Sequence, residues 1–287
     1  MNPWIRILRP VNGLMGLIAT WISAFIGVGY ALPRYILPVL IASISVFLVT
    51  SAGNILNDIL DRETDNVNHP NRPIPSGEIT IGLARIYAYL MFILPIALVI
   101  PYTLLGVYSP FILVIVIVAE LLLITYETRT KNLGLSGNAT VSVLVGLIFI
   151  YGGMAVGAVL PMILLFILAS LSNFSREIIK DIEDIKGDIG RSTFPKAHGA
   201  YMASKVASAS MILAIIISPM PFLFGIFSYP YLVAVSIADI IFLVSIHNIV
   251  NDPERKEKLS KIAMILALAA FVIGGITANV VVPTAII

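Results

Sequence analysis

The chain has 287 residues, of which 59% are hydrophobic and only 12% are charged, with a formal net charge of +2 and a mean hydropathy of +0.99. A soluble domain has about 25% charged residues, so this chain has too few to cover a surface that faces water on every side. The composition therefore excludes a soluble enzyme, a nucleic-acid-binding domain and a disordered chain, and it predicts an all-α, polytopic membrane bundle.

In chain order, nine apolar segments are long enough to cross a bilayer, which takes about 20 residues. Long continuous apolar runs distinguish them from the alternating strands of a β-barrel. The connections alternate between short ones, rich in Pro, Gly, Ser and Tyr, and long ones that carry nearly all the charge. We expect one integral-membrane domain over residues 1–287, with spans at 13–32, 36–57, 82–104, 110–126, 139–158, 160–177, 203–225, 229–248 and 262–282.

The basic residues predict the orientation of these spans. Of the 18 lysines and arginines, all but Arg34 lie in the N-terminal segment, in the long connections or within four residues of them. Cytoplasmic loops carry the excess of Lys and Arg, so we expect a multi-pass protein of the cell membrane with a cytoplasmic N-terminus and an outer C-terminus. The acidic residues follow the same distribution, apart from Glu120 and Asp239 inside spans. One chemically equipped face is typical of an enzyme acting at the cytoplasmic interface.

The first long connection begins with an acidic pattern. Asp58, Asp61 and Asp65 are separated by three and four residues, which would place them within about 60° of one another on a single helix. Asn54 lies one turn earlier on the same face, and Asn57 precedes the first aspartate. We name these three aspartates the first acidic motif, and we expect it at the cytoplasmic end of the second span.

The connection after the sixth span repeats the pattern as a second acidic motif. Asp181, Asp184 and Asp188 have the same spacing, and Glu177 takes the place that Asn54 has in the first copy. Carboxylates on one face repel one another and favour a bound cation. Carboxylate and amide oxygens suit Mg²⁺, which also takes oxygens from a substrate phosphate. A solvated, polar helix end is the alternative for one copy, but the repetition favours a metal site.

Basic and polar side chains beside the two acidic motifs could hold the remaining phosphate oxygens. The candidates are Arg9, Asn12, Arg72, Tyr126, Lys131, Arg176 and Lys180. Each basic residue could instead be a positive-inside anchor at the membrane surface. That interpretation is favoured for Arg6, Arg255, Lys256, Lys258 and Lys261.

Together, the Asn54–Asp65 pattern, the second acidic motif and the Tyr126-x-x-x-x-Lys131 pair resemble the UbiA superfamily of intramembrane prenyltransferases over essentially the whole chain. The resemblance implies nine transmembrane helices around a central cavity with a cytoplasmic cap, binding a Mg²⁺–prenyl diphosphate. It also implies individual roles. The metal ligands would be Asp58, Asp61, Asp65, Asp181, Asp184 and Asp188, which with Lys131 form the catalytic set. Asn54 and Asn57 would assist in binding the metals or phosphates, and Lys131, Arg72 and Tyr126 would contact the diphosphate.

Within the superfamily, residues 175–188, followed by 190–195, are similar to the archaeal digeranylgeranylglyceryl phosphate synthases. That similarity implies transfer from geranylgeranyl diphosphate to geranylgeranylglyceryl phosphate, a lipid-like acceptor, which makes the diether core of archaeal membrane lipids. The acceptor's proton could leave to a carboxylate, water or diphosphate.

Three other functions compete with this interpretation. A UbiA-type enzyme could use an aromatic quinone precursor or a porphyrin as its acceptor. A divalent-cation transporter is disfavoured because no polar funnel marks the outer side. A CDP-alcohol phosphotransferase is disfavoured because its Asp-Gly and Ala-Arg elements do not accompany the aspartates.

Two further features lie inside the spans. Intramembrane acids are costly unless paired, so we expect Glu120 either at the floor of the cavity or in an interhelical hydrogen bond. For Asp239 we expect a structural role. Gly153-x-x-x-Gly157 is typical of close helix packing.

Overall fold

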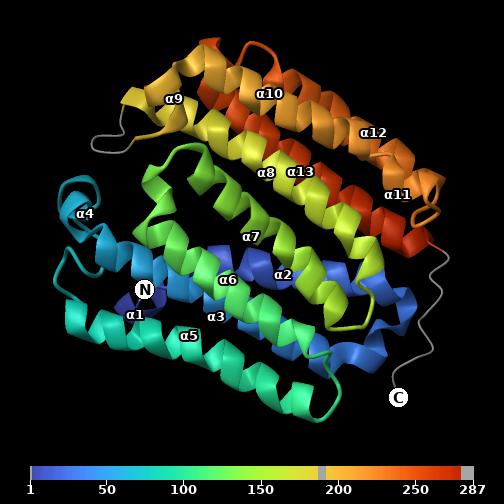
Figure 1. Ribbon diagram of the computed structural model, residues 1–287, viewed down its shortest axis with the longest axis horizontal. Helices are drawn as coiled ribbons and strands as arrows, with labels where there is room; N and C mark the ends of the chain where they lie inside the picture. The colour runs from blue at the N-terminus through green and yellow to red at the C-terminus, as the bar shows by residue number, and fades with distance from the viewer. Residues whose placement is uncertain (1, 187–191, 279–287) are drawn as a thin grey trace.

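The computed structural model describes residues 2–186 and 192–278, and over these residues every regular element is a helix (Figure 1). The amino-terminal half contains α1 (Pro3–Arg6), α2 (Pro10–Val28), η1 (Gly29–Tyr35), α3 (Ile36–Leu60), α4 (Arg62–Asn68), α5 (Ile81–Leu104), α6 (Phe111–Thr128), η2 (Thr130–Asn132) and α7 (Leu135–Met154). The carboxy-terminal half contains α8 (Leu160–Glu183), η3 (Asp184–Lys186), α9 (Phe194–His198), α10 (Ala200–Ile217), α11 (Met220–Leu223), α12 (Tyr229–Ile246), η4 (Ile249–Asn251) and α13 (Pro253–Thr277).

Eight stretches of the described chain are long and apolar enough to cross a membrane. The first, Pro10–Leu60, contains two helices, α2 and α3, which the 3₁₀ turn η1 joins. The sequence divides this stretch into two predicted spans, and each remaining predicted span falls on one remaining stretch. The predicted all-α, multi-span bundle is therefore confirmed.

Two helices extend further than the sequence predicts. α8 continues to Glu183, and α13 begins at Pro253, where the sequence indicated a loop as far as residue 261. The side chain of Asp252 caps α13 by accepting a hydrogen bond from the backbone N–H of Arg255, and proline is well suited to the first turn. The charged residues after position 253 therefore project from a helix.

The first acidic motif was predicted to lie on one continuous helix, but the structure divides it between two. α3 ends at Leu60, Asp61 forms the break, and α4 begins at Arg62. Asp61 belongs to both helix ends, because its N–H donates to the carbonyl of Asn57 in α3 and its own carbonyl accepts from the N–H of Asp65 in α4. Figure 1 shows α4 turned away from the line of α3, so the motif spans two helices.

Small residues allow the central helices to approach closely. A Cβ on Gly152 of α7 would lie 2.7 Å from the backbone oxygen of Thr20 on α2, and one on Gly153 would lie 2.3 Å from Cγ of Met162 on α8. Gly157 does not share this role, because it lies beyond the end of α7 with φ 74°. The predicted Gly153–Gly157 packing motif is therefore correct for its first member only.

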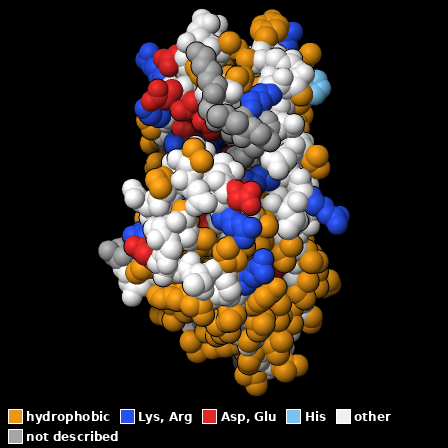
Figure 2. Space-filling view, turned by 90° about the vertical axis from the view of Figure 1, so that its left-hand side faces the viewer, with side chains coloured by type: hydrophobic (Ala, Val, Ile, Leu, Met, Phe, Trp, Pro, Cys, Tyr) orange, Lys and Arg blue, Asp and Glu red, His pale blue; other side chains and the backbone are white. Residues whose placement is uncertain are grey.

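The short helices α1, α4 and α9 gather at one end of the bundle (Figure 1). Figure 2 looks onto this end and shows Lys, Arg, Asp and Glu side chains clustered there, with hydrophobic side chains below them. We call it the charged end. It holds both acidic motifs as far as they are described, and it positions the site.

Candidate active site

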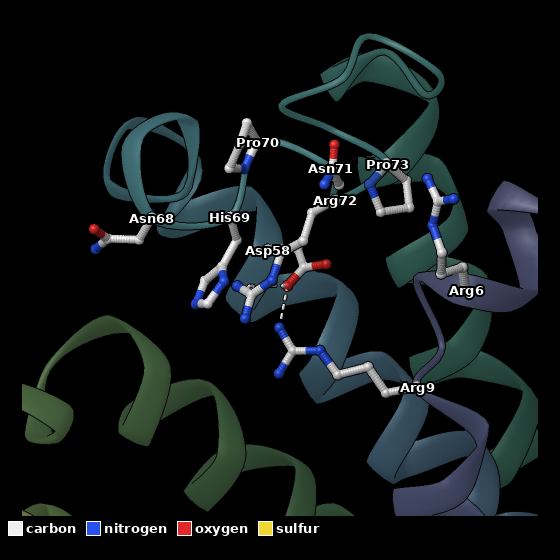
Figure 3. Close-up of a pocket in the computed structure, with 9 residues that line it drawn as sticks. All are labelled: Arg6, Arg9, Asp58, Asn68, His69, Pro70, Asn71, Arg72 and Pro73. Atoms are coloured by element: carbon white, nitrogen blue, oxygen red, sulfur yellow. Dashed lines mark hydrogen bonds and ion pairs between the residues drawn. The ribbon is translucent and has the colours of Figure 1, made fainter.

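The deepest part of the first acidic motif is an aspartate enclosed by two arginines. The side chain of Asp58 is only 2% exposed and forms an ion pair with the guanidinium of Arg9. Arg72 places Nη1 at 3.6 Å from Asp58 Oδ1 and at 2.5 Å from Asp65 Oδ2. Arg72 therefore joins α3 to α4 across the helix break, and Figure 3 shows the guanidinium groups of both arginines directed at the Asp58 carboxylate.

The backbone of Arg9 has an unusual conformation that serves this contact. Arg9 precedes α2 with φ 47°, in the left-handed region that most residues avoid. From there its Nη2 also donates to Asn57 Oδ1, at 3.1 Å. A strained backbone held at a cluster of charges is typical of a functional site.

The other part of the motif is centred on a buried lysine. Lys131, with a side chain 8% exposed, places Nζ at 2.6 Å from Asp61 Oδ2 and at 3.1 Å from Glu127 Oε2. Asn57 donates from Nδ2 to the same two carboxylates, at 3.1 Å and 3.0 Å. Glu127 was not among the predicted site residues, although a Glu four residues before a Lys is a known pairing signal.

A pocket of about 370 Å³ opens on the charged end, beside Asp58 and its two arginines (Figure 3). Its lining includes Arg9, Asp58 and Arg72, together with His69 and Asn71 from the loop after α4. Guanidinium groups at the edge of a water-facing pocket are well placed to bind phosphate oxygens.

The second acidic motif is only partly described. Asp181 Oδ2 accepts a hydrogen bond from Nδ2 of Asn138 on α7, at 2.8 Å, and Asp184 lies exposed at the start of η3. Asp188 lies outside the described residues. Over residues 2–186 and 192–278, no three His, Asp or Glu side chains converge as a ready metal site. The aspartates instead have cationic or amide partners, and their hard oxygens remain the donor type that Mg²⁺ prefers.

A central cavity of about 690 Å³ lies between the helices, as the resemblance implied. Most of its lining is apolar, from helices that include α2, α3, α6, α7, α8, α10, α12 and α13. Its polar lining includes four predicted site residues, which are Asn12, Asn54, Tyr126 and Arg176, and also Glu127, Asp239 and Lys261.

The intramembrane acids differ in their surroundings. Asp239 Oδ2 accepts a hydrogen bond from the hydroxyl of Ser218, at 2.6 Å, and Asp239 also lines the cavity, so its expected structural role stays a prediction. Glu120 is buried on α6 and does not line the cavity, so it is not at the cavity floor. Its Oε1 makes no hydrogen bond within the described chain.

The remaining predicted binding residues lie on α8. Arg176 forms ion pairs with Glu177 of the same helix and with Glu257 of α13, the latter at 2.8 Å between Nη1 and Oε1. Lys180 is exposed in the last turn of α8 and does not line the cavity.

Comparison with known proteins gives a consistent result. A model of the UbiA prenyltransferase family matches residues 17–269. The chain is 38% identical to digeranylgeranylglyceryl phosphate synthase from Methanothermobacter thermautotrophicus, over 96% of each chain. It is 37% identical to the same enzyme from Methanosphaera stadtmanae, over 96% of this chain and all of that one.

Solved structures agree with the sequence relatives. A structure of digeranylgeranylglyceryl phosphate synthase superposes with a TM-score of 0.84 at 31% identity, covering 96% of this chain and 98% of that one. A UbiA homologue from Archaeoglobus fulgidus, bound to GPP and Mg²⁺, shares the fold at a TM-score of 0.68 and 16% identity, covering 94% and 99%.

Proposed function

Because this chain belongs to the UbiA prenyltransferase family, we propose that it transfers a geranylgeranyl group from geranylgeranyl diphosphate to the hydroxyl of geranylgeranylglyceryl phosphate. The protein is a multi-pass membrane prenyltransferase. The observation that carries the proposal is the charged cluster of Arg9, Arg72 and Lys131 beside a largely apolar cavity, which is lined by Glu127, the partner of Lys131. The acceptor follows from relatives that share more than a third of their residues with the chain over its whole length.

The proposed architecture has nine crossings. The break at η1 separates α2 from α3, and each of these helices has enough residues to cross a bilayer on its own. With nine crossings and the charged end in the cytoplasm, the N-terminus is inside and the C-terminus is outside.

In the proposed reaction, the C–O bond between the prenyl chain and the diphosphate breaks, and its electron pair leaves with the diphosphate. Arg9, Arg72 and Lys131 donate hydrogen bonds to the departing group and stabilise its charge. The oxygen of the acceptor hydroxyl forms the new ether bond to the prenyl carbon, and its proton passes to a carboxylate, to water or to the departed diphosphate. The apolar cavity holds the prenyl chain and keeps water from the allylic cation.

The carboxylates of the first acidic motif, with Asp181 and Asp184, would hold Mg²⁺ in this proposal. Bound there, the metal supplies positive charge that neutralises the diphosphate and promotes its departure. The donor chemistry fits, because each candidate ligand is a carboxylate and Asn57 adds an amide oxygen beside Asp58.

The test is transfer from radiolabelled geranylgeranyl diphosphate by the purified protein in lipid, with geranylgeranylglyceryl phosphate and a panel of aromatic acceptors. We expect a doubly prenylated glycerol phosphate that disappears with EDTA. Asp61→Asn should lower kcat by about 100-fold, since a site that stabilises developing charge typically loses that much with one group. Glu63→Gln is the matched control, because Glu63 is exposed on α4 and should retain activity. Transfer only to an aromatic acceptor would contradict the proposed acceptor and retain the reaction type.

A further inference from the structure

Two cationic side chains line the central cavity far from the first acidic motif in sequence. Arg176 lies on α8 and Lys261 lies on α13, and both belong to the cavity lining. Their cationic groups approach the same carboxylate oxygen, Glu257 Oε1, at 2.8 Å and 2.9 Å. The two cations are therefore within about 6 Å of each other, close enough for one phosphate group to bridge them.

The carboxylates that pair with these two cations do not line the cavity. Glu257 has a side chain only 5% exposed, and neither Glu257 nor Glu177 belongs to the cavity lining. The carboxylates therefore orient Arg176 and Lys261 without occupying the cavity. Arg176 has five N–H donors, and its contacts with Asn173, Glu177 and Glu257 leave others for a ligand.

This pair is separate from the cations assigned to the diphosphate. Arg9 and Arg72 line the pocket on the charged end, whereas Arg176 and Lys261 line the central cavity, and neither list of lining residues includes a member of the other pair. Apart from them, the charged residues of the cavity lining are Glu127 and Asp239, which are acids. An anionic group entering the cavity would therefore meet its positive partners at Arg176 and Lys261.

We propose that Arg176 and Lys261 bind the phosphate monoester of the acceptor and so select a phosphorylated glycerol over a neutral or aromatic acceptor. This inference rests on the proposed function, in which both substrates are anionic and two separate sets of cations are needed. Glu257 is a positioning residue in this arrangement, because it holds both cations without facing the cavity. Lys261, which the sequence alone favoured as a surface anchor, is then a specificity-determining residue.

The test compares Lys261→Gln with wild type, because the Lys261 side chain is 57% exposed and Arg176 remains to neutralise Glu257. Binding of geranylgeranylglyceryl phosphate and of its dephosphorylated form, geranylgeranylglycerol, is measured by calorimetry in nanodiscs without the prenyl donor. We expect about a tenfold weaker Kd for the phosphorylated ligand, as for the loss of one charge-assisted contact, and no change for the alcohol. Turnover should show the same rise in KM for the acceptor, with KM for the prenyl diphosphate unchanged.

Lys258→Gln is the matched control, since Lys258 lies one turn earlier on α13, pairs with Glu254 at 2.5 Å and does not line the cavity. An equal loss for both ligands, or no loss, would overturn the phosphate site. Repeating the titration in nanodiscs with anionic phospholipid distinguishes the ligand's source, and competition at equal affinity would assign the site to a lipid headgroup instead.

The two proposals fail in different ways. Selective loss of binding in Lys261→Gln, with no transfer by wild type, would retain the phosphate site and reject the proposed reaction. Transfer by wild type with unchanged binding in Lys261→Gln would retain the proposed reaction and reject the phosphate site. A wild-type protein that neither binds nor prenylates the phosphorylated acceptor would overturn both.

Discussion

At the scale of single residues, Glu127 shows how a sequence motif can be incomplete. Its carboxylate joins Asn57 on α3 to Lys131 after α6, and its side chain is only 7% exposed. The acidic motifs are recognisable because they repeat a spacing, whereas Glu127 stands alone beside Tyr126. Only the folded chain shows that this glutamate lies among residues more than 60 positions away.

Replacing Glu127 with Gln should impair catalysis while preserving the fold. The amide is isosteric but uncharged, so it weakens the hold on Lys131, which contacts the departing diphosphate in the proposed reaction. We expect kcat to fall about tenfold, as for the loss of one charge-assisted hydrogen bond. Steady-state kinetics beside a melting curve in detergent would check this, and an unchanged kcat would show that Asp61 alone positions the lysine.

At the scale of helices, the interiors were predictable and the charged ends were not. Each apolar run gave a helix, because in lipid the backbone must satisfy its own hydrogen bonds. The break at Asp61 and the early start of α13 depend on caps and tertiary partners, which hydropathy does not contain. As a result, each acidic motif leaves its long helix at its middle aspartate: Asp61 separates α3 from α4, and Asp184 begins the 3₁₀ helix η3 after α8.

The close contact of α2 with α7 should be sensitive to one methyl group. Gly152→Ala would place a Cβ 2.7 Å from the backbone oxygen of Thr20, and backbone cannot rotate aside as a side chain can. We expect a loss of about 1–3 kcal/mol in stability, as for other overpacked sites. Thermal unfolding in detergent would measure it. Gly82→Ala on α5 is the control, because nothing lies within 4 Å of its Cβ and the substitution should be neutral or slightly stabilising.

At the scale of the whole molecule, composition and charge distribution were enough to predict the fold class. The pairing of distant residues was not predictable in the same way. Arg9 meets Asp58 across 49 positions and Arg176 meets Glu257 across 81, and no local pattern encodes either contact. The sequence could therefore identify the aspartates of the candidate site but could not divide the basic residues between the pocket proposed for the diphosphate and the central cavity.

The proposed orientation can be tested directly because the chain contains no cysteine. Val67→Cys would place a thiol on α4 at the charged end, where position 67 is 82% exposed, and Leu105→Cys would place one in a short connection at the opposite end, where position 105 is 77% exposed. With an impermeant maleimide on right-side-out vesicles, we expect labelling at position 105 at once and at position 67 only after permeabilisation. The opposite result would invert the protein in the membrane.

In the proposed reaction, the first acidic motif takes part in binding both Mg²⁺ and the prenyl diphosphate. Its ion pairs imply that each of these ligands raises the affinity for the other. Every aspartate of the motif already has an arginine or lysine partner, so a divalent cation arriving alone must compete with them. When a diphosphate binds, the basic groups can pair with its oxygens, and the carboxylates then become available to the metal. The two affinities are therefore linked, and thermodynamic reciprocity requires each ligand to strengthen the other by the same factor. Calorimetric titration of Mg²⁺ with and without an unreactive prenyl diphosphate should show an affinity at least about fivefold higher in its presence, at the lower end of typical coupling energies. Equal affinities would show that the arginines and the lysine stay paired with the aspartates when the diphosphate binds.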